Sequence, residues 1–389
     1  VRILMKIKNQ MNRVVIESVI NGFSKYPLWI LLSLYLNTRG YNFIDIGIII
    51  VLSNIISSPL QRKSGKLIDI LGRFRFSYLI PFFMFIVYSI LYFSVSFNLS
   101  IYLIFIMLTL SSYLSGFEST LKNTIISDLS LEEERTKYFS LMRIWANVGI
   151  GIGLICSGLA SILSYSLFFI APIIGSLVQM ILFYVFFEET GKNVNVVIDH
   201  KVPIVRGNAY GKIISVSLLI GICFAIANQY ETPAMPLYLK TQWLLSPFLI
   251  TVLYSINTAV VVFFQSSITK FAVKYTDHKI FLIFSLTANI FLLASAIIIL
   301  TVGENLMSPV SSSIISKIAP EDKRGEYFGI NSFIYNMVSP VSLFLGIGLL
   351  QIFSTHETYA MYALSALSII AFLAAYTYLG NLSGKAVPS

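Results

Sequence analysis

Apolar and polar positions alternate along this chain in long blocks. Each apolar block holds about 20 residues or more, the length that a helix needs to cross the hydrocarbon core of a bilayer. The ten-residue stretches of alternating polarity that build a membrane-spanning barrel are absent from the sequence. The blocks lie at residues 13–36, 43–65, 76–97, 100–127, 139–163, 166–187, 211–239, 246–272, 279–318, 327–352 and 358–380.

The block at residues 279–318 has room for two helices, so the pattern predicts twelve transmembrane helices. A polar segment interrupts the series after the sixth helix. We therefore predict an all-α integral membrane protein made of two pseudo-symmetric six-helix bundles. The first bundle covers residues 1–187, a cytoplasmic linker covers 188–210, and the second bundle covers 211–389.

Composition agrees with this pattern. Of the 389 residues, 56% are hydrophobic and 12% are charged, against about 45–50% and about 25% in soluble globular proteins. The mean hydropathy is +0.80. These values exclude a soluble enzyme, a nucleic-acid-binding domain and a disordered scaffold.

Lysine and arginine gather in every second connection between the predicted helices. The connections on the other side carry only Arg39 and Lys240. Because cytoplasmic loops hold the excess of basic residues, both termini are expected in the cytoplasm of a multi-pass plasma-membrane protein. The net charge of +9 then needs no nucleic-acid partner. The basic residues of the inner side include Arg62, Lys63, Lys66, Arg73, Arg75, Arg135, Lys137, Lys270, Lys274, Lys279, Lys317, Lys323 and Arg324.

The two halves of the chain resemble each other. The segment 33–36 reads SLYL and the segment 236–239 reads PLYL. The segment 125–139 reads IISDLSLEEERTKYF, and its counterpart at 314–328 reads IISKIAPEDKRGEYF. Parallel halves of this kind are a transporter architecture.

A motif follows the second apolar block. From Gly65 to Arg75 the chain reads GKLIDILGRFR. This segment resembles the loop signature of the major facilitator superfamily, and the layout of six plus six helices extends the resemblance over the whole chain. Two positions depart from the signature: Ile70 stands where a basic residue is expected, and Phe74 interrupts the basic pair.

The resemblance implies a gate at the inner end of the bundle. In the family, the equivalent of Asp69 faces the N-terminal end of the eleventh helix, here near residues 325–327, where free N–H groups favour an anion. The contact holds the inner gate closed in the outward-open state. The gating residues would be Gly65, Asp69, Gly72, Arg73 and Arg75. For Arg75, a simple topology charge is an equal alternative.

Within the superfamily, the second half resembles the drug/proton antiporter branch. The features that carry this resemblance are Gly303-Glu304, Pro309 and the segment APEDKRG at 319–325. A glycine-rich fifth helix, with Gly149, Gly151, Gly153 and Gly158, is similar to the antiporter motif of that branch but lacks its Gly-Pro pair. The arginine usual in the fourth helix is replaced by Ser112.

Seven ionisable residues fall inside the predicted helices, where each costs about 2.5–3.5 kcal/mol at mid-helix and is a functional candidate by default. Four are glutamates on helices one, four, seven and ten, which line the central cavity in the family. As proton-coupling residues we propose Glu304 first, then Glu231, Glu118 and Glu17. The other three are Lys25, Lys122 and Arg143.

Structural alternatives stand beside these roles. Glu17 and Arg13, and likewise Glu118 and Lys122, have the four-residue spacing of an ion pair within one helix. Lys25 is expected either to pair with a glutamate or to receive an anionic substrate. Arg143 and Trp145 either contact substrate or extend to the membrane interface. The full set of candidate substrate-binding residues is Asn21, Lys25, Tyr26, Lys122, Arg143, Trp145, Asn228 and Tyr230.

The sequence thus predicts a secondary active transporter, in the first instance for proton-coupled efflux of an amphipathic organic compound. Proton-coupled uptake of a small anion or peptide is the first alternative, and a non-transporting sensor on the same fold is the second. No enzyme motif stands out. No cofactor is expected beyond an ion gradient, with protons favoured over sodium. The expected partners are a small-molecule substrate and the lipid bilayer, and we expect the protein to be a monomer.

Overall fold

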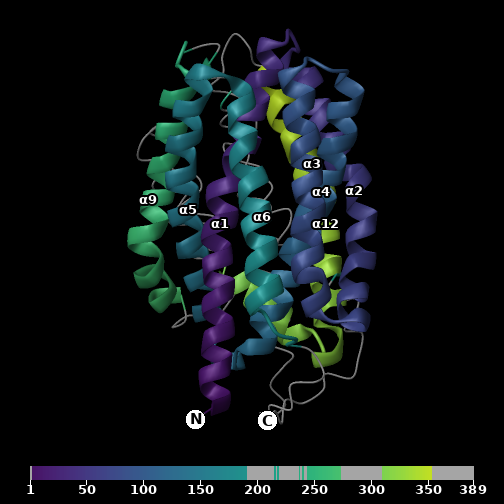
Figure 1. Cartoon of the computed structure of the whole chain (residues 1–389), viewed down its shortest axis with the longest axis vertical. Helices are drawn as coiled ribbons and strands as arrows, with labels where there is room; N and C mark the ends of the chain where they lie inside the picture. Colours follow the sequence, from purple (N-terminus) through teal and green to yellow (C-terminus); the bar gives the residue numbers. More distant parts are fainter. Residues whose placement is uncertain are drawn as a thin grey trace.

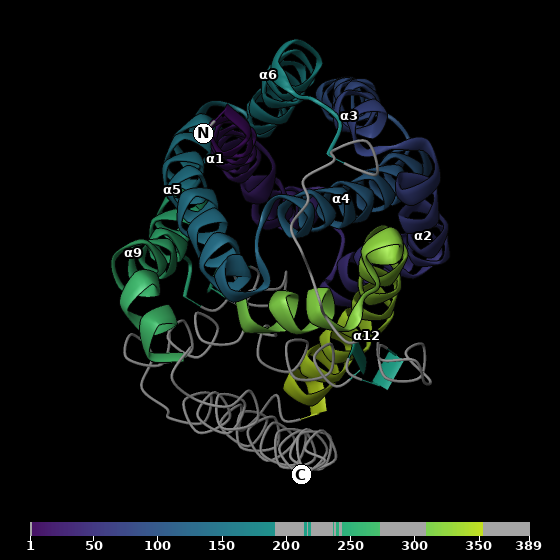
Figure 2. The same cartoon turned by 90° about the horizontal axis from the view of Figure 1, so that it is seen from below.

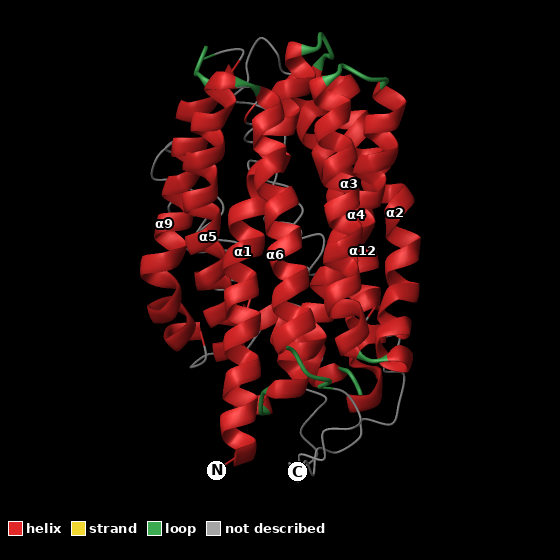
Figure 3. Cartoon of the chain, in the orientation of Figure 1, coloured by secondary structure: helices red, strands yellow, loops and turns green. Residues whose placement is uncertain are grey.

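The structure is a computed structural model of the chain. It describes residues 2–190, 214–215, 217–218, 236, 239–240, 243–272 and 309–352. In these residues the chain is helical without any strand, as the sequence predicts (Figure 3). The helices are α1 (Arg2–Thr38), α2 (Phe43–Leu71), α3 (Arg73–Ser96), α4 (Ile101–Leu129), α5 (Arg135–Leu163), α6 (Ile170–Phe186), α9 (Pro247–Ala272) and α12 (Arg324–Ile352), with short 3-10 helices η1 (Glu132–Glu134), η2 (Tyr165–Phe169) and η4 (Glu321–Lys323).

Within the described part of the chain, six helical stretches are long and apolar enough to cross a membrane, by length and composition. They correspond to α2, α3, α4, α5, α6 and α9. The predicted helices within 211–239, 279–318 and 358–380 lie largely or wholly outside the described residues, and so does the linker beyond residue 190. The division into two bundles therefore remains a prediction for the second half.

Two predicted boundaries are wrong. Helix α1 begins at Arg2 and not near residue 13, because the polar residues at its start contain no helix breaker. Helix α2 continues to Leu71 and not to residue 65, so that most of the gating motif is helical. The break comes at Gly72, whose φ of 92° is open to glycine but strained for other residues, and α3 begins at the next residue.

The helices stand side by side in one bundle, with the N-terminus at the end that is drawn lowest in Figure 1. We call this the lower end; it holds the turn at Gly72, η1 and η4, whereas the turns at residues 39–42, 97–100 and 164 form the upper end. Seen from below, α12 lies beside α2 and α9 lies beside α5 (Figure 2). These two pairs join the first half of the chain to the second.

The glycines of α5 explain its position between two helices. Space for a side chain is missing at Gly149 and Gly153, where the backbone of α1 at Val19 and Phe23 lies directly against them. At Gly158, on another face of α5, Thr251 of α9 fills the same space. Small residues allow membrane helices to approach this closely. The glycine-rich stretch therefore packs α5 against both α1 and α9.

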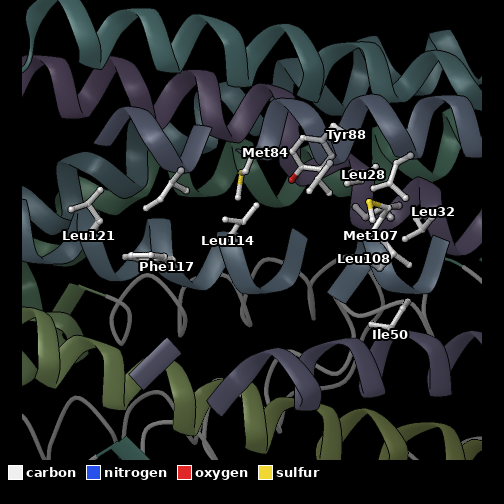
Figure 4. Close-up of a cluster of buried hydrophobic side chains, with 14 of the residues drawn as sticks. Leu28, Leu32, Ile50, Met84, Tyr88, Met107, Leu108, Leu114, Phe117 and Leu121 are labelled. Carbon is white, nitrogen blue, oxygen red and sulfur yellow. The ribbon is translucent and has the colours of Figure 1, made fainter. Parts of the chain in front are cut away.

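The apolar core of the first bundle lies between α1, α3 and α4 (Figure 4). Leu28, Met84 and Leu108 are almost completely buried there. Tyr88 is also buried, and its hydroxyl oxygen accepts a hydrogen bond from Ser111 Oγ at 3.2 Å. This core holds α1 and α4 in the fixed positions on which the polar contacts described next depend.

Candidate functional site: a central cavity, a charge network and a gate

A cavity of about 470 Å³ lies between α1, α2, α4 and α12. This volume is within the range of small-molecule sites, about 300–1,000 Å³. Its lining in the described residues contains no Asp, Glu, Lys or Arg. Instead it offers neutral hydrogen-bonding groups and aromatic rings, contributed by Asn54, Asn123, Asn331, Asn336, Ser112, Ser115, Ser119, Ser332, Ser339, Tyr26, Trp29 and Tyr335.

Of the predicted substrate-binding residues that the structure describes, only Tyr26 lines this cavity. Asn54 of α2, which the sequence analysis did not single out, accepts a hydrogen bond from Ser112 of α4 at 2.5 Å. Ser57 lies 3.0 Å from the same hydroxyl oxygen. Ser112, which stands where the antiporter branch has an arginine, therefore takes part in a neutral hydrogen-bond chain beside the cavity.

The charged residues of α1 and α4 lie in the interior of the first bundle. Lys25 Nζ is 2.8 Å and 3.0 Å from the two carboxylate oxygens of Glu118. Both side chains are nearly inaccessible, with 6% and 10% of their surface exposed. The lysine thus pairs with a glutamate of another helix, and its ammonium group does not line the cavity.

Glu17 and Lys122 form the second pair. Lys122 Nζ lies 2.8 Å from Glu17 Oε2, and the amide of Gln179 on α6 donates to Glu17 Oε1 at 2.8 Å. Asn21 lies between the two pairs: its Nδ2 donates to Glu118 Oε2 at 2.7 Å and contacts Glu17 Oε1 at 3.4 Å. We call these six residues the charge network.

The structural alternative of ion pairs within single helices is therefore wrong. Glu17 pairs with Lys122 and not with Arg13, and Glu118 pairs with Lys25 and not with Lys122. The reason is that α1 and α4 run in opposite directions, so that the lower residues of the two helices meet and the upper residues meet. Two opposite charges on each helix are neutralised across the interface, which satisfies four buried ionic groups together.

A second, very small cavity of about 10 Å³ touches Glu17, Glu118 and Lys122. This is about the volume that one water molecule requires. Ser119, the neighbour of Glu118 on α4, lines the large cavity instead. The charge network and the central cavity thus lie on different faces of α4.

At the lower end, Asp69 of α2 binds the first turn of α12. Its Oδ1 accepts a hydrogen bond from the backbone N–H of Gly325 at 3.0 Å, and its Oδ2 accepts one from Glu326 at 2.8 Å. The free N–H groups and the dipole of a helix N-terminus favour a carboxylate at this place. The contact that the motif implied is present.

Two arginines extend this contact into a network. Arg73 Nη2 lies 3.2 Å from Asp69 Oδ1, and Arg73 Nε lies 2.9 Å from Asp128 Oδ2 on α4. Arg324 of α12 reaches the other oxygen of Asp128 at 3.1 Å. We call Asp69, Arg73, Asp128 and Arg324, with the N–H groups of residues 325 and 326, the lower gate. It ties the second half of the chain to both α2 and α4.

Glycines allow the helices of the lower gate to touch. A Cβ atom at Gly65 would collide with the carbonyl group of Gly325, and one at Gly329 would lie 3.0 Å from the carbonyl oxygen of Gln61. Gly72 has no room either, because the carboxylate of Glu189 lies against it. The roles predicted for Gly65 and Gly72 thus have a steric basis.

The remaining members of the motif differ from one another. Arg75 is exposed, and no ion pair joins it to any residue in the described part of the chain. Glu189, which follows α6, accepts hydrogen bonds from the backbone N–H groups of Arg73 at 2.9 Å and Phe74 at 3.1 Å. It therefore caps the N-terminus of α3, and the start of the predicted linker lies against the gating turn.

Beyond the cavity lining, four residues with charged or amide contacts are not predicted as site residues from the sequence: Asp128, Arg324, Gln179 and Glu189. The internal repeat held a signal for two of them, since Asp128 and Arg324 belong to the matched segments 125–139 and 314–328. For Gln179 and Glu189 the sequence holds no comparable signal, because their partners are more than 100 positions away.

The other candidates separate into two groups. Trp145 has 43% of its surface exposed and, like Arg143, does not line the central cavity. Asn228, Tyr230, Glu231 and Glu304 lie outside the described residues. No group of three or more His, Cys, Asp or Glu side chains that could hold a metal ion occurs in the part of the chain that the structure describes.

The family model of the Major Facilitator Superfamily matches residues 15–301 and 280–388. The chain belongs to the major facilitator superfamily. Members of this superfamily are transporters of small molecules rather than enzymes, and the chain is accordingly a multi-pass membrane protein. Among curated proteins, no match to the sequence was found.

Solved structures agree with the fold of the superfamily. A bacterial homologue of the iron transporter ferroportin in its outward-facing state has 15% identity and a TM-score of 0.72, over 96% of this chain and 99% of that one. The human organic anion transporter MFSD10 has 12% identity and a TM-score of 0.70, over 94% and 99%. A proton:xylose symporter bound to 6-bromo-6-deoxy-D-glucose has 14% identity and a TM-score of 0.69, over 96% of each chain.

Proposed function

We propose that this protein exchanges protons for an amphipathic organic small molecule by alternating access, as in the drug/proton antiporter branch. The observation that carries the proposal is the separation of two sites on α4. A neutral, partly aromatic cavity lies on one face of the helix, and buried carboxylates paired with lysines lie on another. The lower end, closed by the lower gate, is the cytoplasmic end in this proposal, in agreement with its basic residues.

Protons suit the charge network better than sodium does. Each carboxylate oxygen pair is already occupied by an ammonium group and an amide, which leaves little room for the several oxygen ligands that a metal cation needs. A proton needs only one lone pair. Protonation of Glu118 would remove the negative charge that compensates Lys25, and a buried charge without a partner is strongly unfavourable. The proton thus has a direct effect on the α1–α4 interface.

The cavity favours a substrate that combines hydrogen-bonding groups with apolar surface. Asparagine and serine side chains supply donors and acceptors, while Tyr26, Trp29 and Tyr335 supply ring faces. Uptake of an anion, the first alternative, needs a cation in the cavity. Lys25 is the residue that this alternative invokes, and its ammonium group is held by Glu118 in the interior of the bundle.

The lower gate favours a working transporter over a non-transporting sensor. The motif departs from the family pattern at Ile70 and Phe74. Nevertheless Asp69, Arg73, Asp128 and Arg324 form a continuous set of ion pairs across the two halves. A protein that did not move would need no such removable connection. We propose that it acts as a monomer in the plasma membrane.

The test is transport by the purified protein in proteoliposomes that hold a pH-sensitive dye. A preset pH gradient is challenged with three probes: ethidium as an amphipathic cation, xylose as a neutral polyol and benzoate as an organic anion. Antiport predicts that ethidium collapses the gradient in a protein-dependent way. Collapse of the gradient by benzoate alone would support the anion alternative. If a probe is transported but no protons move with it, proton coupling is refuted.

A matched pair of variants locates the coupling. Glu118→Gln removes the carboxylate of the charge network, whereas Glu133→Gln changes an exposed glutamate of η1. We expect the Glu118→Gln protein to retain counterflow of the transported probe but to lose the ability to concentrate the probe against its gradient. Glu133→Gln should keep both activities. If Glu118→Gln still concentrates the probe as the parent does, Glu118 is not the coupling residue.

A further inference from the structure

Gln61 of α2 has an unusual position between the central cavity and the lower gate. Its side chain is completely buried, with 0% of its surface exposed. It lies against Gly116 of α4, which lines the cavity, and its backbone carbonyl lies against Gly329 of α12. The residue therefore lies where α2, α4 and α12 meet, at the joint between the two halves of the chain.

The amide of Gln61 has no hydrogen-bond partner among the residues that the structure describes. This holds for both Nε2 and Oε1. Buried polar groups are almost always satisfied, and one that is not loses its hydration without compensation. Nearby buried hydroxyls such as Ser57 and Ser64 have partners, whereas Gln61 lacks described partners for both of its amide atoms.

The joint between α5 and α9 offers a comparison, because Thr269 meets Ser140 there as Gly65 meets Gly329 in the joint between α2 and α12. Helix α9 carries Gln265 four residues before Thr269, just as α2 carries Gln61 four residues before Gly65. The amide of Gln265 donates to Thr269 Oγ1 at 3.0 Å, and that oxygen lies 2.8 Å from Ser140 Oγ on α5. In the repeat, Ser140 corresponds to Gly329. The joint between α5 and α9 thus has two hydroxyls where the joint between α2 and α12 has two glycines.

We propose that Gln61 is a positioning residue that keeps the lower gate ready to open. In the closed gate its amide is unsatisfied, which raises the free energy of the closed state. When α2 and α12 separate, water reaches the amide and this penalty disappears. Gln61 thereby offsets part of the stability that the ion pairs of the lower gate give to the closed state, so that the gate is not locked. The inference rests on the proposed function, because it assumes that the halves separate at this joint.

The test measures opening of the gate directly, without substrate or a proton gradient. Thr124 of α4 is fully buried between two contacts that join the halves, Thr120 with Ser332 and Asp128 with Arg324. A cysteine at this position, Thr124→Cys in a background with Cys156→Ser and Cys223→Ser, reacts with N-ethylmaleimide only when the gate opens. Its labelling rate therefore reports the open population.

Replacement of the unsatisfied amide by an apolar side chain of similar volume should stabilise the closed gate. For Gln61→Met we expect labelling to slow by about fivefold to a hundredfold, the range that corresponds to relief of an unsatisfied buried amide. Gln61→Leu serves as the second variant if the first does not fold, and the midpoint of thermal unfolding should not fall in either. Labelling that is unchanged or faster in the folded variants would overturn the proposal.

Gln265→Met is the matched control, because it removes from the α5–α9 joint an amide whose nitrogen is hydrogen-bonded. It should not slow labelling of the cysteine at position 124. Equal slowing in both variants would show that the effect is not specific to Gln61 and would also overturn the proposal. Since labelling needs no transported probe, this proposal can fail while proton-coupled transport is demonstrated, and the reverse also holds.

Discussion

Asp69→Asn tests the lower gate most directly. The parent carboxylate accepts two hydrogen bonds from the N-terminus of α12, at 3.0 Å and 2.8 Å, and contacts Arg73 at 3.2 Å. Its side chain is only 9% exposed, so solvent screens these interactions little. The asparagine keeps one oxygen for one N–H group, but it turns an NH₂ group toward the second and carries no charge.

The magnitude follows from the contacts that are lost. A hydrogen bond to a charged group contributes about 1.5–3 kcal/mol, and the charge at a helix N-terminus contributes about 0.3–1 kcal/mol more. Together the substitution should destabilise the closed gate by about 2–4 kcal/mol. This corresponds to an increase of about 30-fold to a thousandfold in the ratio of open to closed molecules, with the observed rate levelling off once most molecules are open.

The assay is the maleimide reaction of the cysteine at position 124, and the matched control is Arg75→Gln. Arg75 belongs to the same motif but is exposed and has no ion-pair partner in the described part of the chain. We expect Asp69→Asn to label much faster than the parent and Arg75→Gln to label within about twofold of it, the range of a surface substitution. An Asp69→Asn protein that labels at the parental rate would refute the assignment of Asp69 to the gate. A large effect of Arg75→Gln would show that the topology reading of this residue is wrong.

Three further predictions follow from the same contacts. Lys25→Met alone should lower the free energy of unfolding by about 3–5 kcal/mol, since it leaves Glu118 buried without its partner; the double variant with Glu118→Gln should recover much of this loss in chemical denaturation, and a double variant less stable than Lys25→Met would contradict the pairing. Gly65→Ala should speed labelling at position 124, because its methyl group would collide with the carbonyl of Gly325 and separate the helices; parental labelling of a folded Gly65→Ala protein would count against this packing. Glu189→Gln should lower the free energy of unfolding by about 1 kcal/mol, because it weakens the cap at the N-terminus of α3. Glu188→Gln is the neighbouring comparison, and an unchanged free energy of unfolding in Glu189→Gln would mean that the cap contributes nothing.

The sequence predicts the helices well because a transmembrane helix is a local property. Twenty apolar residues are visible without knowledge of any partner, and the ends at Thr38, Ser96 and Leu163 lie within two residues of the predicted ones. The errors at α1 and α2 have a local cause too. Polarity alone predicts a loop after residue 65, although in the segment from Lys66 to Gly72 only Gly72 has a backbone conformation that ends a helix.

The pairing of charges could not be predicted in this way. Spacing along one helix places Glu118 and Lys122 on one face, and this is true in the structure as well. However, Glu118 pairs with Lys25, 93 positions away, and Lys122 pairs with Glu17, 105 positions away. These partners are determined by the antiparallel arrangement of α1 and α4, which spacing along one helix does not reveal. The gate contact of Asp69 was predictable for a different reason: a family motif carries the three-dimensional information that spacing lacks.

Helix α4 connects the three parts of the site. Glu118 and Lys122 hold it to α1, Ser112 and Ser119 face the chain of neutral groups and the cavity, and Asp128 holds it to the second half through Arg324. A proton on Glu118 would weaken the connection between α4 and α1, and a substrate in the cavity would contact the face of α4 that carries Ser112 and Ser119. Because a helix transmits displacement along its axis as a rigid element, both events act on Asp128 some ten residues further along α4, about 15 Å. Proton and substrate can therefore influence the same gate without touching each other, which is the physical requirement for coupled exchange in the proposed function.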